Sequence, residues 1–333
     1  MNFRERENAW IVAEIGVNHE GSLESAKNLI HLASDSGVDA VKFQSYKPDG
    51  YISNFDALRK ERVRKFALSA EDFRALATCA KKAGVTFFST PLTLSDVELV
   101  ASISPVIKIA SGELTWHELI QHVAETDKPI IISTGLGLEA EIQKAVDVVL
   151  DVRPSAKEDG SLVLMHCVSA YPTPEGQANL ANIQWLKDKF GLPVGYSDHT
   201  KSVKAAELAI MYNVCVIEKH FTDEKEGRSF RDHELSANPA EMATLVRRVR
   251  RAEVLKGSYE RQRGSAESDY FVAARRAVAA AEDIPSGIPV KPGWLTGLRP
   301  MSGIPVEQSS KIVGNRLKRP VKAGDLIQEG DLE

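Results

Sequence analysis

The chain has 333 residues, of which 43% are hydrophobic and 26% are charged, with a formal net charge of −4 and a pI near 6.1. This composition is typical of a soluble globular protein, and the slight acidity argues against nucleic acid as a partner. No apolar stretch approaches the ~18 residues of a membrane span, and the charged start MNFRERENAW does not resemble a signal peptide. We therefore expect neither a nucleic-acid nor a membrane partner.

Short β-branched segments alternate with amphipathic helical segments over the first 256 residues. One helical segment begins with a capping-box-like Ser69 and Asp72 and ends at Gly84. Near-continuous apolar strands between helices indicate a parallel sheet covered on both faces, and eight such units favour a closed (β/α)₈ (TIM) barrel. The absence of GxGxxG after the first strand argues against a dinucleotide-binding fold. The predicted strands are 10–17, 39–44, 86–91, 106–111, 129–134, 162–167, 193–198 and 214–220.

The composition of the sequence changes after residue 256. Residues 257–270 are polar and predict a linker. Residues 271–333 carry short strand-like runs with frequent Gly and Pro, which predicts a small β-rich domain with little core of its own. We therefore predict a barrel domain at 1–256, a linker at 257–270 and a small domain at 271–333.

Two further features bear on location and surface. The three cysteines, Cys79, Cys167 and Cys215, share no CxxC spacing, and each lies in an apolar segment. We expect buried free thiols and a cytoplasmic location. The one basic run, RRVRR at 247–251, falls in a helical pattern, and we expect it to form a solvated or subunit-facing helix surface.

Polar side chains gather where the predicted strands end. In a (β/α)₈ barrel the catalytic groups come from these C-terminal strand ends and the loops after them. A barrel interior is usually filled by apolar side chains, so a dense polar set is costly unless it meets a polar ligand. The set includes Glu14, Lys42, Gln44, Thr90, Lys108, Ser111, Glu113, Ser133, His166, Ser169, Tyr171, Ser197, Asp198, His199, Glu218, Lys219 and His220.

Two kinds of chemistry stand out in this set. Ammonium and hydroxyl donors on nearby strands suit a phosphate, which needs charge and several directed hydrogen bonds. His199 and His220 end adjacent strands and could share one metal ion, leaving positions open for water and a substrate oxygen. The phosphate donors are Lys42, Lys108, Ser111, Ser133 and Ser197.

Each residue also has a structural interpretation. A strand-end histidine can be a satisfied structural residue, and an interior lysine can form a structural salt bridge with Glu14 or Glu113. Tyr171 could cap the barrel, and Asp232 could cap a loop. The shared location of these residues, rather than any one of them, indicates a site.

Seven motifs occur in the order AEIGVNHEG, VKFQ, KIASGE, STG, HCVSAYPTP, GYSDHT and EKHFT. Together they resemble the sialic acid synthase family, which includes the N-acetylneuraminate, legionaminate and pseudaminate synthases. GYSDHT combined with EKHFT is highly specific. The C-terminal segments ARRAVAAAEDIPSG, LRPMSGIP and RPVKAGDLI resemble the SAF (antifreeze-like) domain of this family. The resemblance covers essentially the whole chain.

The resemblance implies a transferase that condenses phosphoenolpyruvate with an N-acetylated amino sugar, either N-acetylmannosamine or a diacetamido dideoxy relative. The implied products are a nine-carbon 2-keto sugar acid and phosphate, in the service of cell-surface polysaccharide biosynthesis. The implied cofactor is a divalent cation, Mn²⁺ first, with Mg²⁺ or Co²⁺ as alternatives. The implied assembly is a domain-swapped homodimer in which Arg299 reaches the neighbouring subunit's barrel.

Carried over position by position, the resemblance implies roles for individual residues. His199 and His220 correspond to the metal ligands, Glu14 to the catalytic acid/base, and Lys42 to a group near the reacting centre. The implied phosphoenolpyruvate contacts are Lys108, Ser111, Ser133 and Ser197; the implied sugar contacts are Gln44, Tyr171 and Asp232; Thr90, Ser169 and Arg299 complete the substrate-binding residues.

Two other functions remain open. Another phosphoenolpyruvate-dependent aldol-type synthase, using a phosphorylated sugar, would need a second basic cluster in the loop 45–68. That loop is shorter than the family usually carries and is implied to lie over the sugar site; it contains Lys47, Arg59, Lys60, Arg62, Arg64 and Lys65. A non-catalytic sugar-binding protein would predict losses among Glu14, His199 and His220, and all three are present.

Overall fold

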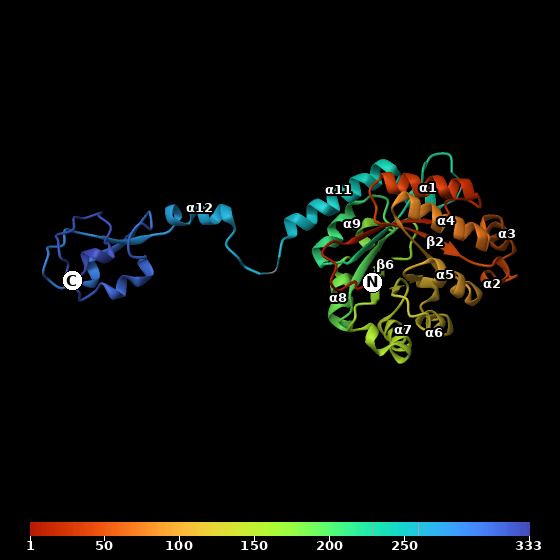
Figure 1. Ribbon diagram of the computed structural model, residues 1–333, viewed down its shortest axis with the longest axis horizontal. Helices are drawn as coiled ribbons and strands as arrows, with labels where there is room; N and C mark the ends of the chain where they lie inside the picture. Colours follow the sequence, from red (N-terminus) through yellow and green to blue (C-terminus); the bar gives the residue numbers. More distant parts are fainter. Residues whose placement is uncertain (229, 259) are drawn as a thin grey trace. The chain divides into compact units, whose positions relative to one another are not determined.

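The computed structural model describes residues 1–228, 230–258 and 260–333, which form two compact units, Met1–Gly257 and Ser258–Glu333. In the first unit, eight parallel strands close into a barrel in sequence order (Figure 1). The (β/α)₈ prediction is confirmed, and each predicted strand matches an observed one to within two residues at either end. The strands are β1 (Trp10–Gly16), β2 (Ala40–Ser45), β3 (Thr86–Pro91), β4 (Ile107–Ile109), β5 (Ile130–Ser133), β6 (Leu162–Cys167), β7 (Val194–Asp198) and β8 (Val216–His220).

Helices cover the outside of the barrel (Figure 1). Local signals fix their ends as the sequence predicts: in α4, Ser69 and Asp72 form a capping box, and Gly84 closes the helix with a φ of 80°. The helices of this unit are α1 (Leu23–Asp35), α2 (Pro48–Tyr51), α3 (Ala57–Phe66), α4 (Ala70–Ala83), α5 (Val97–Ile103), α6 (His117–Ala124), α7 (Glu139–Val152), α8 (Ala181–Phe190), α9 (Lys204–Ala209), α10 (Asp232–Leu235) and α11 (Pro239–Lys256).

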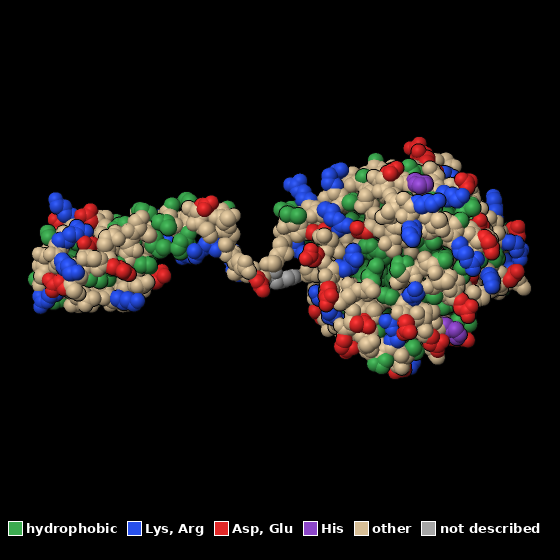
Figure 2. Space-filling view, in the orientation of Figure 1, with side chains coloured by type: hydrophobic (Ala, Val, Ile, Leu, Met, Phe, Trp, Pro, Cys, Tyr) green, Lys and Arg blue, Asp and Glu red, His purple; other side chains and the backbone are tan. Residues whose placement is uncertain are grey.

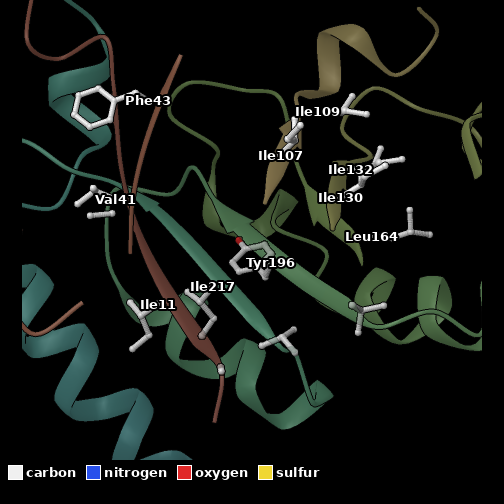
Figure 3. Close-up of a cluster of buried hydrophobic side chains, with 14 of the residues drawn as sticks. Ile11, Val41, Phe43, Ile107, Ile109, Ile130, Ile132, Leu164, Tyr196 and Ile217 are labelled. Atoms are coloured by element: carbon white, nitrogen blue, oxygen red, sulfur yellow. The ribbon is translucent and has the colours of Figure 1, made fainter. Parts of the chain in front are cut away.

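The strands present two different faces because successive side chains alternate between the inside and the outside of the barrel. The outward positions pack against the helices and are apolar, among them Ile11, Val41, Phe43, Ile107, Ile109, Ile130, Ile132, Leu164, Tyr196 and Ile217 (Figure 3). The inward positions begin with a second apolar cluster of Trp10, Val12, Ala40, Phe88, Val106, Ile131, Val163, Met165 and Val216. Further along the same strands, the inward positions become polar and remain buried, as at Glu14, Lys42, Lys108 and Glu218. The barrel therefore has an apolar floor beneath a polar layer.

The second unit consists of helix α12 (Ser265–Ala274) and a small antiparallel sheet of β9 (Ala277–Ala280) and β10 (Leu295–Leu298). Its own core is small and aliphatic, formed by Val278, Ala280, Ile284, Val290, Ile304, Ile312, Leu317, Val321 and Ile327. Helix α12 lies partly within the stretch predicted as a polar linker, so the second half of that stretch is helical rather than extended. No residue of α12 is buried.

The cysteine prediction holds for two residues of three. Cys167 and Cys215 are buried free thiols, whereas Cys79 is only partly buried on α4, with its Sγ 3.6 Å from Nε2 of His31. Cys79 packs against the edge of the core and is only partly buried. An apolar local sequence does not distinguish such a position from a fully buried one. Among the described residues, no helix combines the length and the apolar character needed to cross a membrane.

The basic run lies on α11. Val249 faces the core, while Arg247 and Arg251 are exposed, as expected for a solvated helix surface. Arg250 is more constrained, because its guanidinium lies 2.7 Å from the Asp39 carboxylate beside the start of β2. Elsewhere on the face drawn in Figure 2, basic and acidic side chains are interspersed.

Candidate active site

A cavity of about 370 Å³ opens at the C-terminal ends of the barrel strands. Several residues that the sequence singles out line this cavity, namely Gln44, Ser111, Ser169, Tyr171, His220 and Asp232. Its remaining wall is largely aromatic, aliphatic and basic, with Tyr46, Tyr51, Arg59, Arg62, Val63, Phe66, Leu92, Phe230 and Arg231. The polar layer of the barrel thus meets a space large enough for small substrates, which is where a (β/α)₈ barrel carries its chemistry.

A buried cluster of two lysines and two glutamates lies in the polar layer. The Nζ of Lys42 is 2.8 Å from Oε2 of Glu14 and 3.7 Å from Oε2 of Glu218. The Nζ of Lys108 is also 3.7 Å from Oε2 of Glu218. The Lys42 ammonium donates further to Thr90 Oγ1 at 3.3 Å. The formal charges of this cluster balance, so adding a substrate phosphate would demand either a proton or a cation.

The two glutamates differ in their readiness to hold a proton. Burial raises the pKa of Glu14, and the Glu218 carboxylate adds to this effect, although Lys42 opposes it. Burial would also raise the pKa of Glu218, but Lys108 and Lys42 outweigh it and hold that pKa below its usual value. Environments that push two carboxyl pKa values apart separate an acid from a permanent anion. Glu14 is therefore the carboxyl suited to proton transfer, and Glu218 is the fixed counter-charge.

Hydroxyl groups and a glycine converge beside Lys108. The Ser111 hydroxyl accepts a hydrogen bond from the Gly135 N–H at 3.1 Å and lies 3.1 Å from the Cys167 thiol. A Cβ at Gly135 would fall 2.4 Å from Ser169 Oγ and 2.8 Å from both Ser111 Oγ and Cys167 Sγ. Only glycine fits there, and it lets the main chain come close to whatever anion the serines hold. Ser133 on β5 and Ser197 on β7 are buried in the same layer, on either side of β6.

His199 and His220 face each other with ring centroids 5.3 Å apart. The Nδ1–H of His199 donates to the Val168 carbonyl at 2.8 Å, which leaves its Nε2 lone pair free. The buried Nδ1 of His220 has no hydrogen-bond partner. Burial lowers the pKa of His199, and it lowers the pKa of His220 well below the usual value, so both rings are neutral near pH 7.

This donor set fits a divalent cation held by two neutral imidazoles, whose other ligands come from water or substrate. Such a site needs ring nitrogens that are free to bind the ion. His220 has a buried Nδ1 without a hydrogen-bond partner among the described residues, and the bond to Val168 fixes the tautomer of His199. No group of three or more His, Cys, Asp or Glu side chains in the described ranges, 1–228, 230–258 and 260–333, is arranged to hold a metal. A cation bound here would therefore have coordination positions left for water or substrate.

Some expected residues lie elsewhere. Asp198, Lys219 and His166 do not enter the cavity, because their strand positions face the helices, and the His166 Nε2 donates to the Ala178 carbonyl at 2.8 Å. Arg299 follows β10 and belongs to the second unit.

Two carboxyl groups near the cavity were not among the residues assigned a role from the sequence. Glu218 shares the inward face of β8 with His220, two residues away, and the strand period of two would have found it. Glu113 lines the cavity wall, and burial raises its pKa to about 7, against the opposing effect of Lys108. The sequence places Glu113 in the polar set at the strand ends and offers it as a salt-bridge partner, but it assigns this residue no catalytic or binding role.

The fold and this buried arrangement of lysine, glutamate, serine and histidine define a (β/α)₈-barrel enzyme with its site at the C-terminal strand ends. Residues 29–261 match the NeuB family and residues 275–333 match the SAF domain, so the chain belongs to the NeuB family and carries a SAF domain. The resemblance to sialic acid synthases is confirmed, and the chain is an enzyme of the transferase type.

Three relatives illustrate the similarity. The chain is 38% identical to an uncharacterized protein of Methanocaldococcus jannaschii, covering 98% of this chain and 95% of the relative. It is 37% identical to the N,N'-diacetyllegionaminic acid synthase of Legionella pneumophila, covering 96% and 93%. Among solved structures, it resembles the N-acetylneuraminic acid synthetase of Leptospira borgpetersenii in complex with citrate, with a TM-score of 0.75, 30% identity and coverage of 79% and 90%.

Proposed function

We propose that this enzyme condenses phosphoenolpyruvate with an N-acetylated amino sugar to give a nine-carbon 2-keto sugar acid and phosphate, for cell-surface polysaccharide biosynthesis in the cytoplasm. The observation that carries the proposal is that three groups lie together in the polar layer at the C-terminal strand ends, beside the cavity that Ser111 and His220 line. These groups are a lysine–serine cluster, a glutamate with a raised pKa, and a pair of neutral histidines.

Phosphoenolpyruvate is proposed to bind on the Lys108 side of the cavity. The Lys108 ammonium supplies charge, the hydroxyls of Ser111 and Ser133 supply directed donors for the phosphate and carboxylate, and Ser169 lines the same cavity. The Ser197 hydroxyl donates to Glu218 Oε1 at 2.9 Å and would turn from it to the ligand, while Thr90 acts by accepting from Lys42. The close approach allowed by Gly135 lets main-chain groups reach the same anion. Holding both substrates in this way places C3 of phosphoenolpyruvate beside the aldehyde carbon and supplies much of the rate enhancement by proximity.

His199 and His220 are proposed to hold Mn²⁺ or a similar divalent cation. When bound, such a cation supplies Lewis-acid polarisation of an oxygen. The protein's own contribution is to present two neutral rings, one with its tautomer fixed by Val168, and to place Tyr171 against them, with its ring centroid 4.3 Å from that of His199.

Glu14 is proposed to move the proton that the condensation requires. As C3 of phosphoenolpyruvate bonds to the aldehyde carbon, the aldehyde oxygen becomes an alkoxide that must gain a proton. Water then adds at C2 and loses one proton. The resulting C2 hydroxyl becomes the keto oxygen as the C2–O bond to phosphate breaks, and phosphate leaves with the second proton. Burial raises the pKa of Glu14, and Lys42 lies 2.8 Å away to stabilise its ionised form. Glu14 can therefore give a proton to the alkoxide or take one from the water.

The acceptor is proposed to be a diacetamido dideoxy sugar of the legionaminate type. Gln44, Tyr171 and Asp232 offer polar contacts to sugar hydroxyls and amides. The outer wall adds apolar surface that suits deoxy and N-acetyl methyl groups, from Val63, Phe66, Leu92 and Phe230. The synthase of Legionella pneumophila, which shares 37% of its residues with this chain, bears the name of a diacetylated product.

A phosphorylated acceptor is the second candidate, and one observation favours it. On α3, Lys60 and Arg64 are each 3.0 Å from the Asp49 carboxylate, whereas Arg59 and Arg62 face the cavity. Among the described residues, neither of these two arginines has an acidic side chain within 4.0 Å. They could meet a phosphate on the far end of a sugar.

The assembly is proposed to be a homodimer in which the SAF domain of one subunit closes the barrel of the other. Arg299, fixed between Gly297 and Pro300 after β10, would then contact the acceptor. An arginine held in a turn presents a rigid fork for a substrate carbonyl or hydroxyl.

The test is a panel assay of phosphate release. The protein would be incubated with phosphoenolpyruvate and Mn²⁺ and offered N-acetylmannosamine, its 6-phosphate, and diacetamido dideoxy hexoses. We expect the highest kcat/KM with a diacetamido sugar. A preference for the 6-phosphate that disappears in Arg59→Ala/Arg62→Ala would favour the second candidate. No phosphate release with any sugar would refute the proposed function.

A further inference from the structure

Behind the two histidines, on the outer face of the barrel, lies a fully buried ion pair. Asp198 ends β7 and Lys219 is its cross-strand partner on β8. Lys219 Nζ is 3.1 Å from Oδ2 of Asp198, and both side chains are 0% exposed. Each is next in sequence to one histidine, Asp198 to His199 and Lys219 to His220, but points the opposite way.

This pair is unusual for its place in the barrel. No other outward position on the described barrel strands carries a charged side chain. Most are apolar, including Tyr196 and Ile217 two residues earlier on the same strands (Figure 3), and the polar exceptions are Ser45, Ser89 and His166. A buried ion pair is weak support for stability, because an apolar pair of similar volume is often equally good. The charges therefore call for a role beyond filling space.

The hydrogen bonds of the pair show what it fixes. Lys219 donates not only to Asp198 but also to the main-chain carbonyls of Thr200 and Ser202, the latter at 3.2 Å. Asp198 Oδ1 accepts from the Thr200 N–H at 2.9 Å and from the Tyr196 hydroxyl at 3.2 Å. An ammonium has three donors, so Lys219 uses all of them, and two serve the turn that follows His199.

His199 lies inside the segment that this network holds. Its own main-chain carbonyl accepts from the Thr173 N–H at 2.8 Å, and its ring is tied to Val168. Because the pair also bridges β7 and β8, it sets the position of one histidine-bearing strand end against the other. The distance between the two imidazole rings then depends on the Asp198–Lys219 ion pair, which touches neither ring.

We propose that Asp198 and Lys219 are positioning residues that fix the spacing of His199 and His220 and thereby set the affinity of the site for a divalent cation. The proposal rests on the proposed metal site. Groups behind metal-binding histidines commonly change metal affinity by 10–100-fold when altered, since they orient the ligands.

The test measures binding rather than catalysis. The double variant Asp198→Asn/Lys219→Met removes both charges together, so no lone charge is left buried, and Asn keeps an oxygen for Tyr196 and Thr200. Mn²⁺ would be titrated into the substrate-free protein and the free ion measured by electron paramagnetic resonance. We expect the Kd for Mn²⁺ to rise about 10–100-fold. The visible bands of the Co²⁺-loaded protein should also shift, because they report ligand geometry.

The chain offers a matched control. Arg250 and Asp39 form a partly buried ion pair, 2.7 Å apart, at the opposite end of the strands. Asp39→Asn/Arg250→Met should lower the melting temperature without changing the Kd for Mn²⁺ or the Co²⁺ spectrum. If the Asp198/Lys219 variant does not fold, Asp198→Asn/Lys219→Gln is the milder substitution, because it also leaves no lone buried charge and keeps a polar group toward the Thr200 carbonyl; a several-fold rise in Kd is then expected.

The outcomes distinguish failure of the metal site from failure of the positioning role. Wild-type protein that binds no Mn²⁺, or whose binding survives His199→Ala, would remove the metal site and this inference with it. Wild-type binding that His199→Ala abolishes, together with unchanged Kd and Co²⁺ spectrum in the Asp198/Lys219 variants, would overturn the positioning role alone. Equal weakening in the variant and in the Arg250 control would reduce the pair to a stabilising contact.

Discussion

Glu14→Gln tests the proton-transfer role most directly. The side chain is buried, with its Oε2 2.8 Å from Lys42 Nζ and its Oε1 accepting from the Gln44 amide at 3.1 Å. Glutamine keeps the shape and an oxygen for Gln44 while removing the transferable proton. We expect turnover to fall by about 100-fold or more, the usual contribution of a positioned general acid or base.

The charge balance of the cluster predicts how substrate affinity should respond. Lys42 and Lys108 are offset by Glu14 and Glu218, so the substitution leaves one uncompensated positive charge where phosphoenolpyruvate is proposed to bind. The KM for phosphoenolpyruvate should therefore stay the same or decrease. The variant should also be less stable, since removing one partner of a buried ion pair costs about 3–5 kcal/mol.

The assay is phosphate release with both substrates varied, after circular dichroism has shown that the variant is folded at the assay temperature. A fall in kcat with an unchanged or lower KM supports the role of Glu14. An unchanged kcat with a large rise in the KM for phosphoenolpyruvate would make Glu14 a binding group, and the reasoning from its raised pKa would be refuted.

Three further predictions follow from the same geometry. Chelation with EDTA should abolish turnover and Mn²⁺ should restore it, with His199→Ala and His220→Ala inactive but folded; full activity of metal-free protein would contradict the metal site. Burial raises the pKa of Glu113 from 4.5 to about 7, so wild type should lose stability, on the order of 2 kcal/mol, as pH rises through that range. Melting curves should then show Glu113→Gln more stable than wild type at pH 8 but not below pH 4.5, and parallel curves would argue against the shift. Arg299→Ala should raise the KM for the sugar more than that for phosphoenolpyruvate. Mixing it with Glu14→Gln and reassociating the subunits should restore one wild-type site per mixed dimer, whereas no restored activity would contradict domain swapping.

The strands were predictable because burial on both faces leaves near-continuous apolar runs, which mark β1 to β8 whatever the tertiary detail. The inward polar layer was predictable for the same reason, since Glu14 and Lys42 interrupt runs that are otherwise apolar. The alternation of side chains between the two faces of a strand carries a further prediction. Counting by twos from His220 would have placed Glu218 inside the barrel and Lys219 outside it.

Other features depend on contacts between distant segments and leave no local signal. The restriction at Gly135 arises from Ser111 after β4, Cys167 at the end of β6 and Ser169 just beyond it. The difference between Glu14 and Glu218 arises from which lysines lie nearest, not from their neighbours in sequence. Sequence motifs could suggest these residues through a family resemblance, but only the folded barrel assigns the partners.

Helix α3 has a consequence for redirecting the enzyme toward other sugars. Phe66 is its only buried residue, yet the segment from Tyr46 to Phe66 supplies much of the outer cavity wall. The barrel core hardly depends on this segment, so it could be exchanged for the corresponding stretch of a relative as a single cassette. Acceptor preference would then change with this segment, while the strand residues proposed to bind phosphoenolpyruvate would stay unchanged.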